Sequence, residues 1–344
     1  MKLFAKTILG LSAGLMLAAP QTASAAYPEK PIKVIINYGA GGNSDTSGRI
    51  LIEALKKAMG AEFFPVNIPG AGGTVGTAQF AAARPDGYTI LYTPIAPVTV
   101  QPHLRKLTYK KDDVVPICGL TQNQLAVMVA PDSPYDSLED LMKAAKAGTS
   151  IVAVGPAPGS IPHIAQAALA NAYGVKFKYV PVGNAAKQTK AILGGQATVS
   201  TDMTSTATLF GLKSLAIIAD QRIDGFKDVP ATKELGIDLA VKIWFGTFAP
   251  KGTPPEIIDK LAEACEKAAA DPDLREKLGK LNFVVRYRNR AVFPTFYEDE
   301  YEGNTPLLKL IGIKLKSGAA TPSIDAARHA TPKILLVLLD APLR

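Results

Sequence analysis

The sequence predicts a two-lobed α/β protein, in which each lobe is a mixed, mostly parallel sheet flanked by helices and the lobes enclose a ligand cleft. Three observations support this fold class. The chain has 344 residues, more than one hydrophobic core usually serves. Apolar strand patterns alternate with helical patterns in both halves. Two extended segments, around residues 120–128 and 241–250, are placed to cross between the lobes as hinge strands.

The first 26 residues have the pattern of a cleaved secretory signal peptide. Lys2 and Lys6 precede an apolar stretch that runs to about Ala19, and Ala23-Ser24-Ala25 follows at a spacing that signal peptidase accepts. The apolar stretch is short for a membrane anchor. We therefore expect a periplasmic protein.

The first half of the mature chain alternates strands and helices, and this order predicts parallel pairing with helices on both faces. The expected elements are a strand at 32–38, a helix at 44–59, a strand at 62–68, a helix at 74–83 and a strand within 85–93.

The second half repeats this order. The expected strands are 125–130, 150–154, 176–181, 197–201 and 214–219, and the expected helices are 136–148, 163–173 and one that ends at 193. Ser137 is the expected N-cap of the first of these helices. A long helix follows the return segment 241–250, with Thr253 as its N-cap and Glu256 completing a capping box. The chain thus returns to the lobe in which it began.

The predicted organisation has four parts. They are a signal peptide at 1–26, lobe 1 at 27–124 and 247–316, lobe 2 at 125–246, and an atypical tail at 317–344. The tail is rich in Ala, Pro and Ser, and its apolar run at 334–339 is too short to cross a membrane. We expect the tail to be a disordered extension.

Two glycine-rich loops each follow a predicted strand and precede a helical pattern. They read NYGAGGNSD at 37–45 and PGAGGTVG at 69–76. A bare backbone lets N–H groups approach an anion, and the start of a helix adds a partial positive charge. Neither loop has the G-x-G-x-x-G spacing of dinucleotide sites, and the chain has no phosphate-binding P-loop. Two such loops at one edge of a sheet favour a binding crevice without a nucleotide cofactor.

Catalytic and metal-binding patterns are weak. The chain has three histidines, and no serine, histidine and acid stand out as a set. The G-x-S-x-G match at 10–14 falls inside the signal peptide. Cys118 and Cys265 could form a disulfide in an exported protein, but we favour two small buried apolar residues. No cysteine–histidine cluster indicates a metal site.

The sequence also predicts roles or positions for three single residues. Asp45 has no evident partner as a base. We therefore favour a first-turn carboxylate that satisfies helix N–H groups and holds the glycine loop in shape. His103 is expected at the surface or in packing, and Trp244 in the core. The net charge of +8 falls to about +6 without Lys2 and Lys6, and the scattered basic residues argue against nucleic-acid binding.

Five segments, in the same order, resemble landmarks of one known family. They are YPEKPIKVIINYGAGGNSD, PGAGGTVG, PDGYTIL, ILGGQATVSTD and WFGTFAPKGTPPEII. Over residues 27–316 the chain resembles the substrate-binding receptors of tripartite tricarboxylate transporters (the Bordetella uptake gene type). The resemblance implies the fold of a two-lobed, type II-like periplasmic binding protein. It also implies a non-enzymatic role, in which a small carboxylate is captured between the lobes and delivered to membrane transporter subunits.

By position, the resemblance also implies a set of ligand-binding residues. In lobe 1 the glycine-loop backbone would contact the ligand and Asp45 would orient the loop. For Tyr38, a wall of the ligand site and a structural role are both open. The full set is Tyr38, Gly39, Ala40, Gly41, Gly42, Ser44, Asp45, Thr93, Gly159, Ser160, His163 and Asp202. These loops contain no arginine, so neutral donors and bridging waters would hold the anion.

Three stretches depart from the family pattern. Asn37-Tyr38 stands where Pro-Phe or Pro-Tyr is usual, the loop at 156–161 has prolines and an isoleucine in place of serines, and Pro181-Val182-Gly183-Asn184 replaces a PYKG stretch. The two second-lobe changes remove hydroxyl or ammonium groups. The hypothesis that follows is a less polar distal pocket that suits a monocarboxylate or an aromatic or apolar acid better than citrate. Two alternatives remain open, an accessory sensor for a membrane kinase and an exported enzyme of small organic acids.

Overall fold

The computed structural model describes residues 27–310. The predicted signal peptide at 1–26, residues 311–316 of the predicted first lobe and the tail at 317–344 therefore lie outside the described residues.

Ten strands form one continuous mixed sheet. In chain order they are β1 (Ile32–Ile36), β2 (Phe63–Asn67), β3 (Thr89–Pro94), β4 (Val114–Val129), β5 (Val152–Gly155), β6 (Lys178–Pro181), β7 (Val199–Met203), β8 (Lys213–Ile218), β9 (Lys242–Pro250) and β10 (Val285–Arg288). The strand order is β2-β1-β3-β9-β4-β7-β5-β6, and β8 and β10 both pair with β4.

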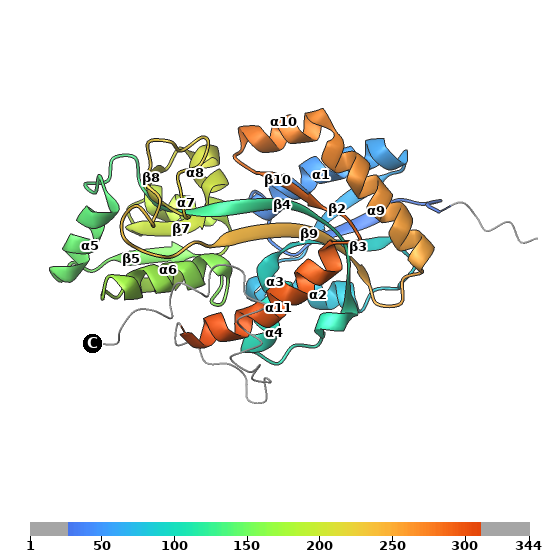
Figure 1. Cartoon of the computed structure of the whole chain (residues 1–344), viewed down its shortest axis with the longest axis horizontal. Helices are drawn as coiled ribbons and strands as arrows, with labels where there is room; N and C mark the ends of the chain where they lie inside the picture. The colour runs from blue at the N-terminus through green and yellow to red at the C-terminus, as the bar shows by residue number, and fades with distance from the viewer. Residues whose placement is uncertain (1–26, 311–344) are drawn as a thin grey trace, which may run out of the picture.

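Helices flank this sheet in each half of the molecule (Figure 1). They are α1 (Asn43–Met59), α2 (Thr74–Ala81), α3 (Ile95–Thr99), α4 (Gln101–Leu104), α5 (Leu138–Lys146), α6 (Ile161–Ala172), α7 (Ala185–Leu193), α8 (Thr204–Phe210), α9 (Pro255–Ala270), α10 (Pro272–Lys280) and α11 (Phe293–Leu310), with short 3-10 turns η1 (Ala71–Gly73) and η2 (Lys111–Asp113).

The sheet is parallel in its outer parts and antiparallel in its middle. β1 pairs in parallel with β2 and β3, and β5 pairs in parallel with β6 and β7. The chain thus contains two α/β units of the predicted kind. The middle strands β4 and β9 pair antiparallel with each other and join the two units.

Strand β4 spans both halves of the molecule. Its residues 114–124 pair with β9, and its residues 125–129 pair with β7 and β8. Figure 1 shows β4 and β9 running side by side through the centre. Both segments that the sequence predicts to cross are therefore strands. The lobe boundaries at 124/125 and 246/247 stay predictions.

Helix capping follows the sequence in one case and departs from it in another. Ser137 caps α5, and its hydroxyl accepts a hydrogen bond from the backbone N–H of Asp140 at 3.1 Å. The prediction that Thr253 caps α9 is wrong. Its hydroxyl instead donates to the carbonyl oxygen of Pro250 at 2.8 Å, and Pro254 precedes the first helical residue. The tight turn after β9 therefore uses the Thr253 hydroxyl.

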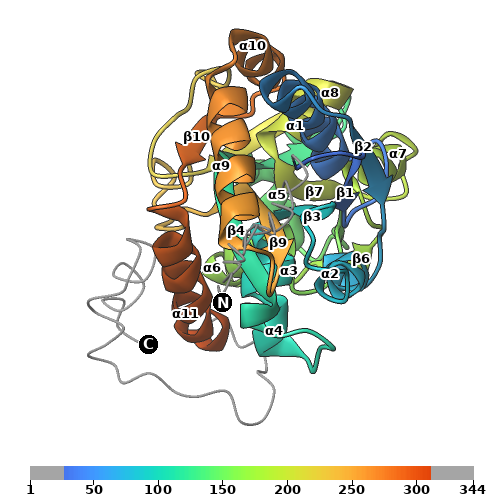
Figure 2. The same cartoon turned by 90° about the vertical axis from the view of Figure 1, so that its right-hand side faces the viewer.

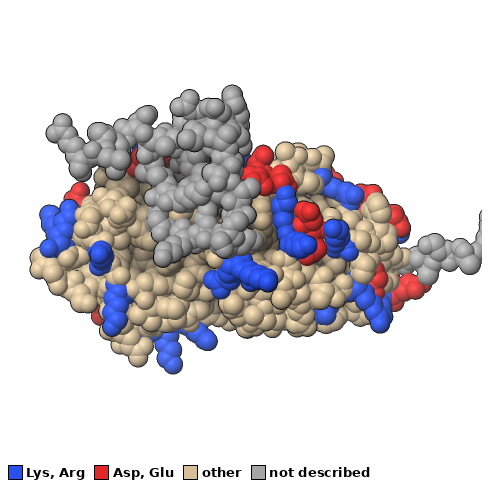
Figure 3. Space-filling view, turned by 90° about the horizontal axis from the view of Figure 1, so that it is seen from below, with Lys and Arg blue, Asp and Glu red and all other residues tan. Residues whose placement is uncertain are grey.

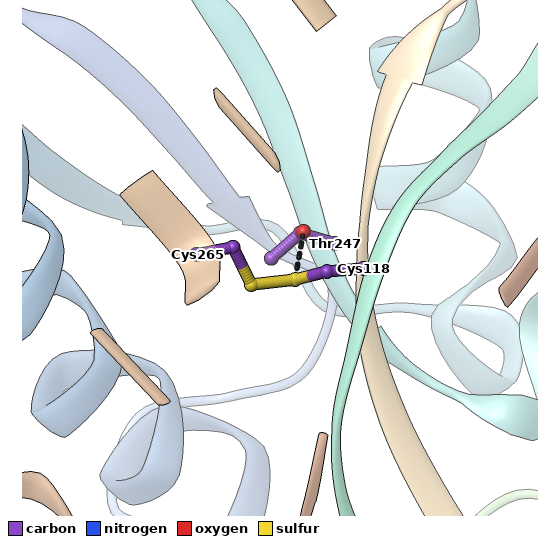
Figure 4. The surroundings of a disulfide bond; sticks show 3 residues. All are labelled: Cys118, Thr247 and Cys265. Atoms are coloured by element: carbon purple, nitrogen blue, oxygen red, sulfur yellow. Dashed lines mark hydrogen bonds between the residues drawn. A yellow bond between two sulfur atoms is a disulfide. The ribbon is translucent and has the colours of Figure 1, made fainter. Parts of the chain in front are cut away.

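The interpretation of Cys118 and Cys265 as two separate apolar residues is wrong, because they form a disulfide. Cys118 lies on β4 and Cys265 on α9, and the hydroxyl of Thr247 on β9 lies 3.2 Å from the Cys118 sulfur (Figure 4). Helix α9 packs against β4 and against α1 (Figure 2). The disulfide therefore fixes this helix to the central strand.

The buried positions of two further residues are now clear. Trp244 on β9 is in the core, as predicted, and its indole N–H donates to Glu300 of α11 at 3.0 Å. His103 is not at the surface. It is buried in α4, and its Nε2 lies 2.9 Å from the carbonyl oxygen of Tyr301.

The surface carries dispersed charge. On the face shown in Figure 3, Lys and Arg side chains are scattered, several of them beside Asp or Glu, and they do not form a stripe. Within residues 27–310, no helix combines the length and the apolar character needed to cross a membrane.

Candidate ligand-binding cleft

The first glycine loop joins the end of β1 to the start of α1 and is held by Asp45. The carboxylate of Asp45 accepts hydrogen bonds from the backbone N–H of Gly41 at 3.0 Å, from Arg49 at 2.9 Å and from Asn67 at 3.0 Å. Burial alone would raise the pKa of this carboxyl, but these hydrogen bonds and the charge of Arg49 hold it below its usual value. Asp45 therefore binds the loop rather than the N–H groups of the helix.

The second glycine loop supports the first through hydrogen bonds. Asn37 donates to the carbonyl oxygen of Gly73 at 3.2 Å and to the hydroxyl of Thr93 at 2.9 Å, and the Tyr38 hydroxyl donates to the carbonyl oxygen of Gly72 at 3.0 Å. A Cβ on Gly73 would lie 3.0 Å from the ring of Tyr38, so this contact requires glycine. Thr93 is buried and positions the first loop.

In the second half of the molecule, the loop before α6 contributes Ser160. This residue is the N-cap of α6, and its hydroxyl accepts from the backbone N–H of His163. The backbone N–H of Gly159 donates to Nδ1 of His163 at 3.2 Å. The imidazole lies against the ring of Tyr179 with 4.5 Å between ring centroids, and its burial lowers the pKa of His163. His163 thus faces β6.

Asp202 lies near the end of β7 and is buried. Its carboxylate accepts hydrogen bonds from the backbone N–H of Met203 at 2.7 Å, from Gln188 at 2.7 Å and from Asn43 at 3.4 Å. Burial raises the pKa of this carboxyl to about 6, although the three hydrogen bonds oppose the rise. A carboxyl whose pKa is raised by burial therefore stands in the wall of the cleft.

A cavity of about 60 Å³ lies between these loops, large enough for several water molecules. Five residues of the predicted set line it: Tyr38, Gly42, Ser44, Ser160 and Asp202. The other seven do not line it in this closed form: Gly39, Ala40, Gly41, Asp45, Thr93, Gly159 and His163. Asp45 and Thr93 hold the first glycine loop, to which Gly39, Ala40 and Gly41 belong. Gly159 and His163 bond to each other at the start of α6.

The sequence reasoning missed most of the cavity wall. The missed polar residues are Asn43, Asn184 and Gln188, and the missed apolar ones include Pro94, Ile95, Ile161, Met203, Ile243 and Phe245. A signal was present for Asn184, because it lies in a stretch that departs from the family pattern and directly precedes a helix. Ile243 and Phe245 carried no such signal, since a strand alone does not show which face meets a ligand.

The amino ends of three helices meet at this cavity. Gly42, Ser160 and Asn184 are the N-caps of α1, α6 and α7, and all three line the cavity. Ser160 and Asn184 cap their helices through side chains, whereas α1 has no side-chain cap. The first N–H groups of α1 are therefore available to an anion. The lining includes no Lys, Arg or His among the described residues.

The two walls of the cleft are in direct contact. Asn43 of α1 donates to the hydroxyl of Thr206 at 2.8 Å, and its side-chain oxygen accepts from Ser205 at 2.7 Å. Asn184 donates to the carbonyl oxygen of Ala40 at 2.8 Å. The structure therefore shows the cleft closed over the cavity.

Closure explains two of the glycines. A Cβ on Gly42 would lie 3.0 Å from Cβ of Asn184, and one on Gly39 would lie 3.2 Å from its amide nitrogen. The bare backbone thus lets the opposite wall approach, in addition to any ligand.

Neither a metal site nor a catalytic set is evident in the described part of the chain. Residues 27–310 contain no group of three or more His, Cys, Asp or Glu that could hold a metal ion. Asp202 has no histidine or hydroxyl nucleophile among its hydrogen-bond partners. The arrangement is suited to holding a small molecule.

Two α/β units joined by paired central strands, closed over a cavity, define a two-lobed solute-binding protein of the periplasmic type. The comparison with known sequences gives the family. Residues 47–313 match the profile described as Tripartite tricarboxylate transporter family receptor, so the chain belongs to this family. Its members are periplasmic solute-binding proteins rather than enzymes.

Relatives agree along most of the chain. Protein BugT of Bordetella pertussis is 32% identical over 311 residues, which cover 87% of this chain and 94% of BugT. The structure of the periplasmic binding protein BugD matches with a TM-score of 0.79 and 28% identity, over 84% of this chain and 99% of that one. MatC of Rhodopseudomonas palustris with bound malate matches with a TM-score of 0.75 and 25% identity, over 83% and 100%. None of these three relatives supports the alternative of a sensor-kinase partner.

Proposed function

We propose that this protein binds a small carboxylate in the cavity between its lobes and presents it to a tripartite tricarboxylate-type transporter. One observation carries the proposal. The amino ends of α1, α6 and α7 meet at a cavity whose lining has no Lys, Arg or His among the described residues. Helix dipoles and uncapped N–H groups stabilise an anion there without a salt bridge.

The ligand carboxylate is expected on the first turn of α1. Gly42, Asn43 and Ser44 line the cavity at this point, and no side chain caps the helix. The related MatC has bound malate, which is also a small carboxylate. In this assignment the glycine loop and Ser44 contact the ligand carboxylate.

The rest of the cavity favours an apolar body on the ligand. Its wall includes Pro156, Ile161, Ile243 and Phe245. Apolar side chains gain free energy from covering apolar ligand surface, at about 25 cal/mol per Å² removed from water. A monocarboxylate, or an aromatic or aliphatic acid, therefore fits better than citrate, whose three carboxylates would each need polar partners.

The test is thermal unfolding of the exported chain with benzoate, hexanoate, malate, adipate and citrate. An acid present at about 100 times its dissociation constant adds about 2.7 kcal/mol to the free energy of unfolding. The neutral isosteres benzamide and hexanamide are the matched ligand controls and should give smaller shifts. Citrate binding as tightly as benzoate or hexanoate would contradict the apolar preference, and no shift with any acid would contradict carboxylate binding.

Delivery to a transporter is tested separately. Membranes that carry the cognate transporter should retain the protein in the presence of its acid and release more of it in the absence of the acid. Closure of the two lobes presents both surfaces at once, which gives the loaded form its own contact surface. Retention that does not depend on the acid would contradict ligand-coupled delivery.

A further inference from the structure

Asp202 places a negative charge in the wall of a cavity that the proposed function fills with an anion. The residue lines the cavity and is only 5% exposed. One carboxylate oxygen accepts from Met203 and Asn43, and the other accepts from Gln188 alone. The second oxygen therefore keeps one free lone pair.

The groups around Asp202 supply no positive charge. Asn43 of α1 and Gln188 of α7 are neutral donors to it, and Ser205 and Thr206 of α8 are occupied by Asn43. The titratable groups that sense its charge are the hydroxyls of Tyr38, before α1, and Tyr179, on β6, and burial raises the pKa of each. The part of the chain that the structure describes offers no Lys, Arg or His to the cavity lining.

The orientation of Gln188 is fixed. Its Nε2 donates to Asp202 and to the carbonyl oxygen of Gly183 at 3.1 Å, and its Oε1 accepts from Ser200 at 2.7 Å. Gln188 thus cannot turn its oxygen toward a proton on Asp202 without breaking both other bonds. A proton on this carboxyl needs an acceptor elsewhere, and the cavity is the open side.

A bound carboxylate is such an acceptor. Two carboxylates in one cavity of about 60 Å³ repel strongly when both are ionised, and the usual outcome for such a pair is that one takes up a proton. Asp202 is the one already surrounded by protein, whereas the ligand anion gains the amino end of α1.

Resting on the proposed function, we propose that carboxylate binding takes up one proton from solvent, which resides on Asp202 in the complex and is donated to the ligand carboxylate. No covalent bond changes. Asp202 is then a specificity residue that favours ligands whose charged group can accept a hydrogen bond. The protein loads best in mildly acidic surroundings and releases more readily as the pH rises.

The direction of the pH dependence follows from the free protein. Burial already raises the pKa of Asp202 to about 6, and a neighbouring anion raises it further in the complex. Below about pH 6 the proton is present before binding, so the dissociation constant is flat. Above pH 6 it must be taken up, so the dissociation constant rises by up to about tenfold per pH unit.

The experiment measures the dissociation constant by calorimetry from pH 5.5 to 8, with the strongest binder among benzoate, hexanoate, malate, adipate and citrate. At pH 7.5 the titration is repeated in phosphate and in Tris, whose heats of ionisation differ, and the difference in measured heat gives the protons taken up. We expect close to one proton in both analyses. A flat dissociation constant with no proton uptake would overturn the proposal.

Two variants locate the proton. Asp202→Asn places an amide opposite the side-chain amide of Gln188. The variant is expected to bind the acid more weakly at every pH, but its dissociation constant should not vary with pH. Asp224→Asn is the matched control, because Asp224 is fully exposed on a loop and should keep the wild-type slope. A wild-type slope in Asp202→Asn would assign the proton to another group and overturn the proposal.

If Asp202→Asn does not fold, the proton count of the wild-type protein decides alone. Glutamate is titrated as an acid that also carries an amino group. Tight, pH-independent binding of glutamate alone would assign Asp202 to an ammonium partner, and would overturn proton uptake. Absence of binding to every acid at every pH would refute the proposed function, which is a different result from binding without a proton.

Discussion

The side-chain amide of Asn184 donates a hydrogen bond of 2.8 Å to the carbonyl oxygen of Ala40 across the cleft. The same side chain caps α7, because its oxygen accepts from the backbone N–H of Lys187 at 3.1 Å. One residue therefore joins the start of a helix on one wall to the glycine loop on the other. Through this residue, closure of the cleft is coupled to the position of the proposed anion site.

Asn184→Ser should weaken ligand binding while the helix stays capped. Serine is a good N-cap but too short to reach Ala40. Loss of one hydrogen bond worth about 1 kcal/mol should raise the dissociation constant about fivefold. Calorimetry gives the affinity, and thermal unfolding checks that stability changes little. An unchanged affinity would show that this bond does not support the ligand-bound form.

Gly42→Ala should impede closure, because the new methyl group would lie 3.0 Å from Cβ of Asn184. We expect a loss of affinity of at least tenfold and a larger radius of gyration in solution scattering. The double variant Gly42→Ala with Asn184→Gly removes the opposing Cβ and should recover part of the affinity. Gly279→Ala in α10 is the control, since a Cβ there meets no atom within 4 Å.

Asp45→Ala should release the first glycine loop and destabilise the protein by about 1–3 kcal/mol near neutral pH. The hydrogen bonds and the charge of Arg49 lower the pKa of Asp45, so its contribution is present above the unfolded-state pKa and is lost as the pH falls through the folded-state value. The difference in free energy of unfolding between wild type and variant should therefore shrink below about pH 4. A difference that stays constant down to pH 2 would exclude an ionised Asp45 as its origin.

Removal of the disulfide should lower stability without removing the site. Cys118 and Cys265 are 147 residues apart in sequence, and closing a loop of that size stabilises a protein by about 2–5 kcal/mol. Cys118→Ser with Cys265→Ser should unfold at lower temperature and still bind its acid at low temperature. Thiol titration of the unfolded wild-type protein should find free cysteine only after reduction.

The sequence pattern identified the repeated α/β order, the extended segments at 120–128 and 241–250 and the capping of α5, because these depend on local periodicity and on short motifs. It did not identify the disulfide, since two cysteines so far apart carry no local signal. It also did not reveal that Asn43 and Asn184 reach across the cleft. Such contacts depend on the relative position of the two walls of the cleft, and the local sequence of a single strand or helix does not specify that position.

The glycine loop shows the same limit in a different form. Its residues were predicted to contact a ligand, and Gly42 and Ser44 do line the cavity. Gly39 and Ala40 instead meet Asn184. A requirement for glycine can arise from an approaching protein atom as well as from an approaching anion, and the sequence does not distinguish the two.

Strand β9 has a consequence for the order in which the molecule can be completed. It supplies the antiparallel partner of β3, although the two strands are separated by the whole of the second α/β unit. A chain that is synthesised and delivered from its amino end therefore exposes strands β1, β2 and β3 first. The edge of β3 stays unpaired until β9 has been synthesised and delivered. The disulfide to Cys265 closes only after that. The unit that begins the chain is the last to be finished, and during that interval its exposed edge is where a chaperone would be needed most.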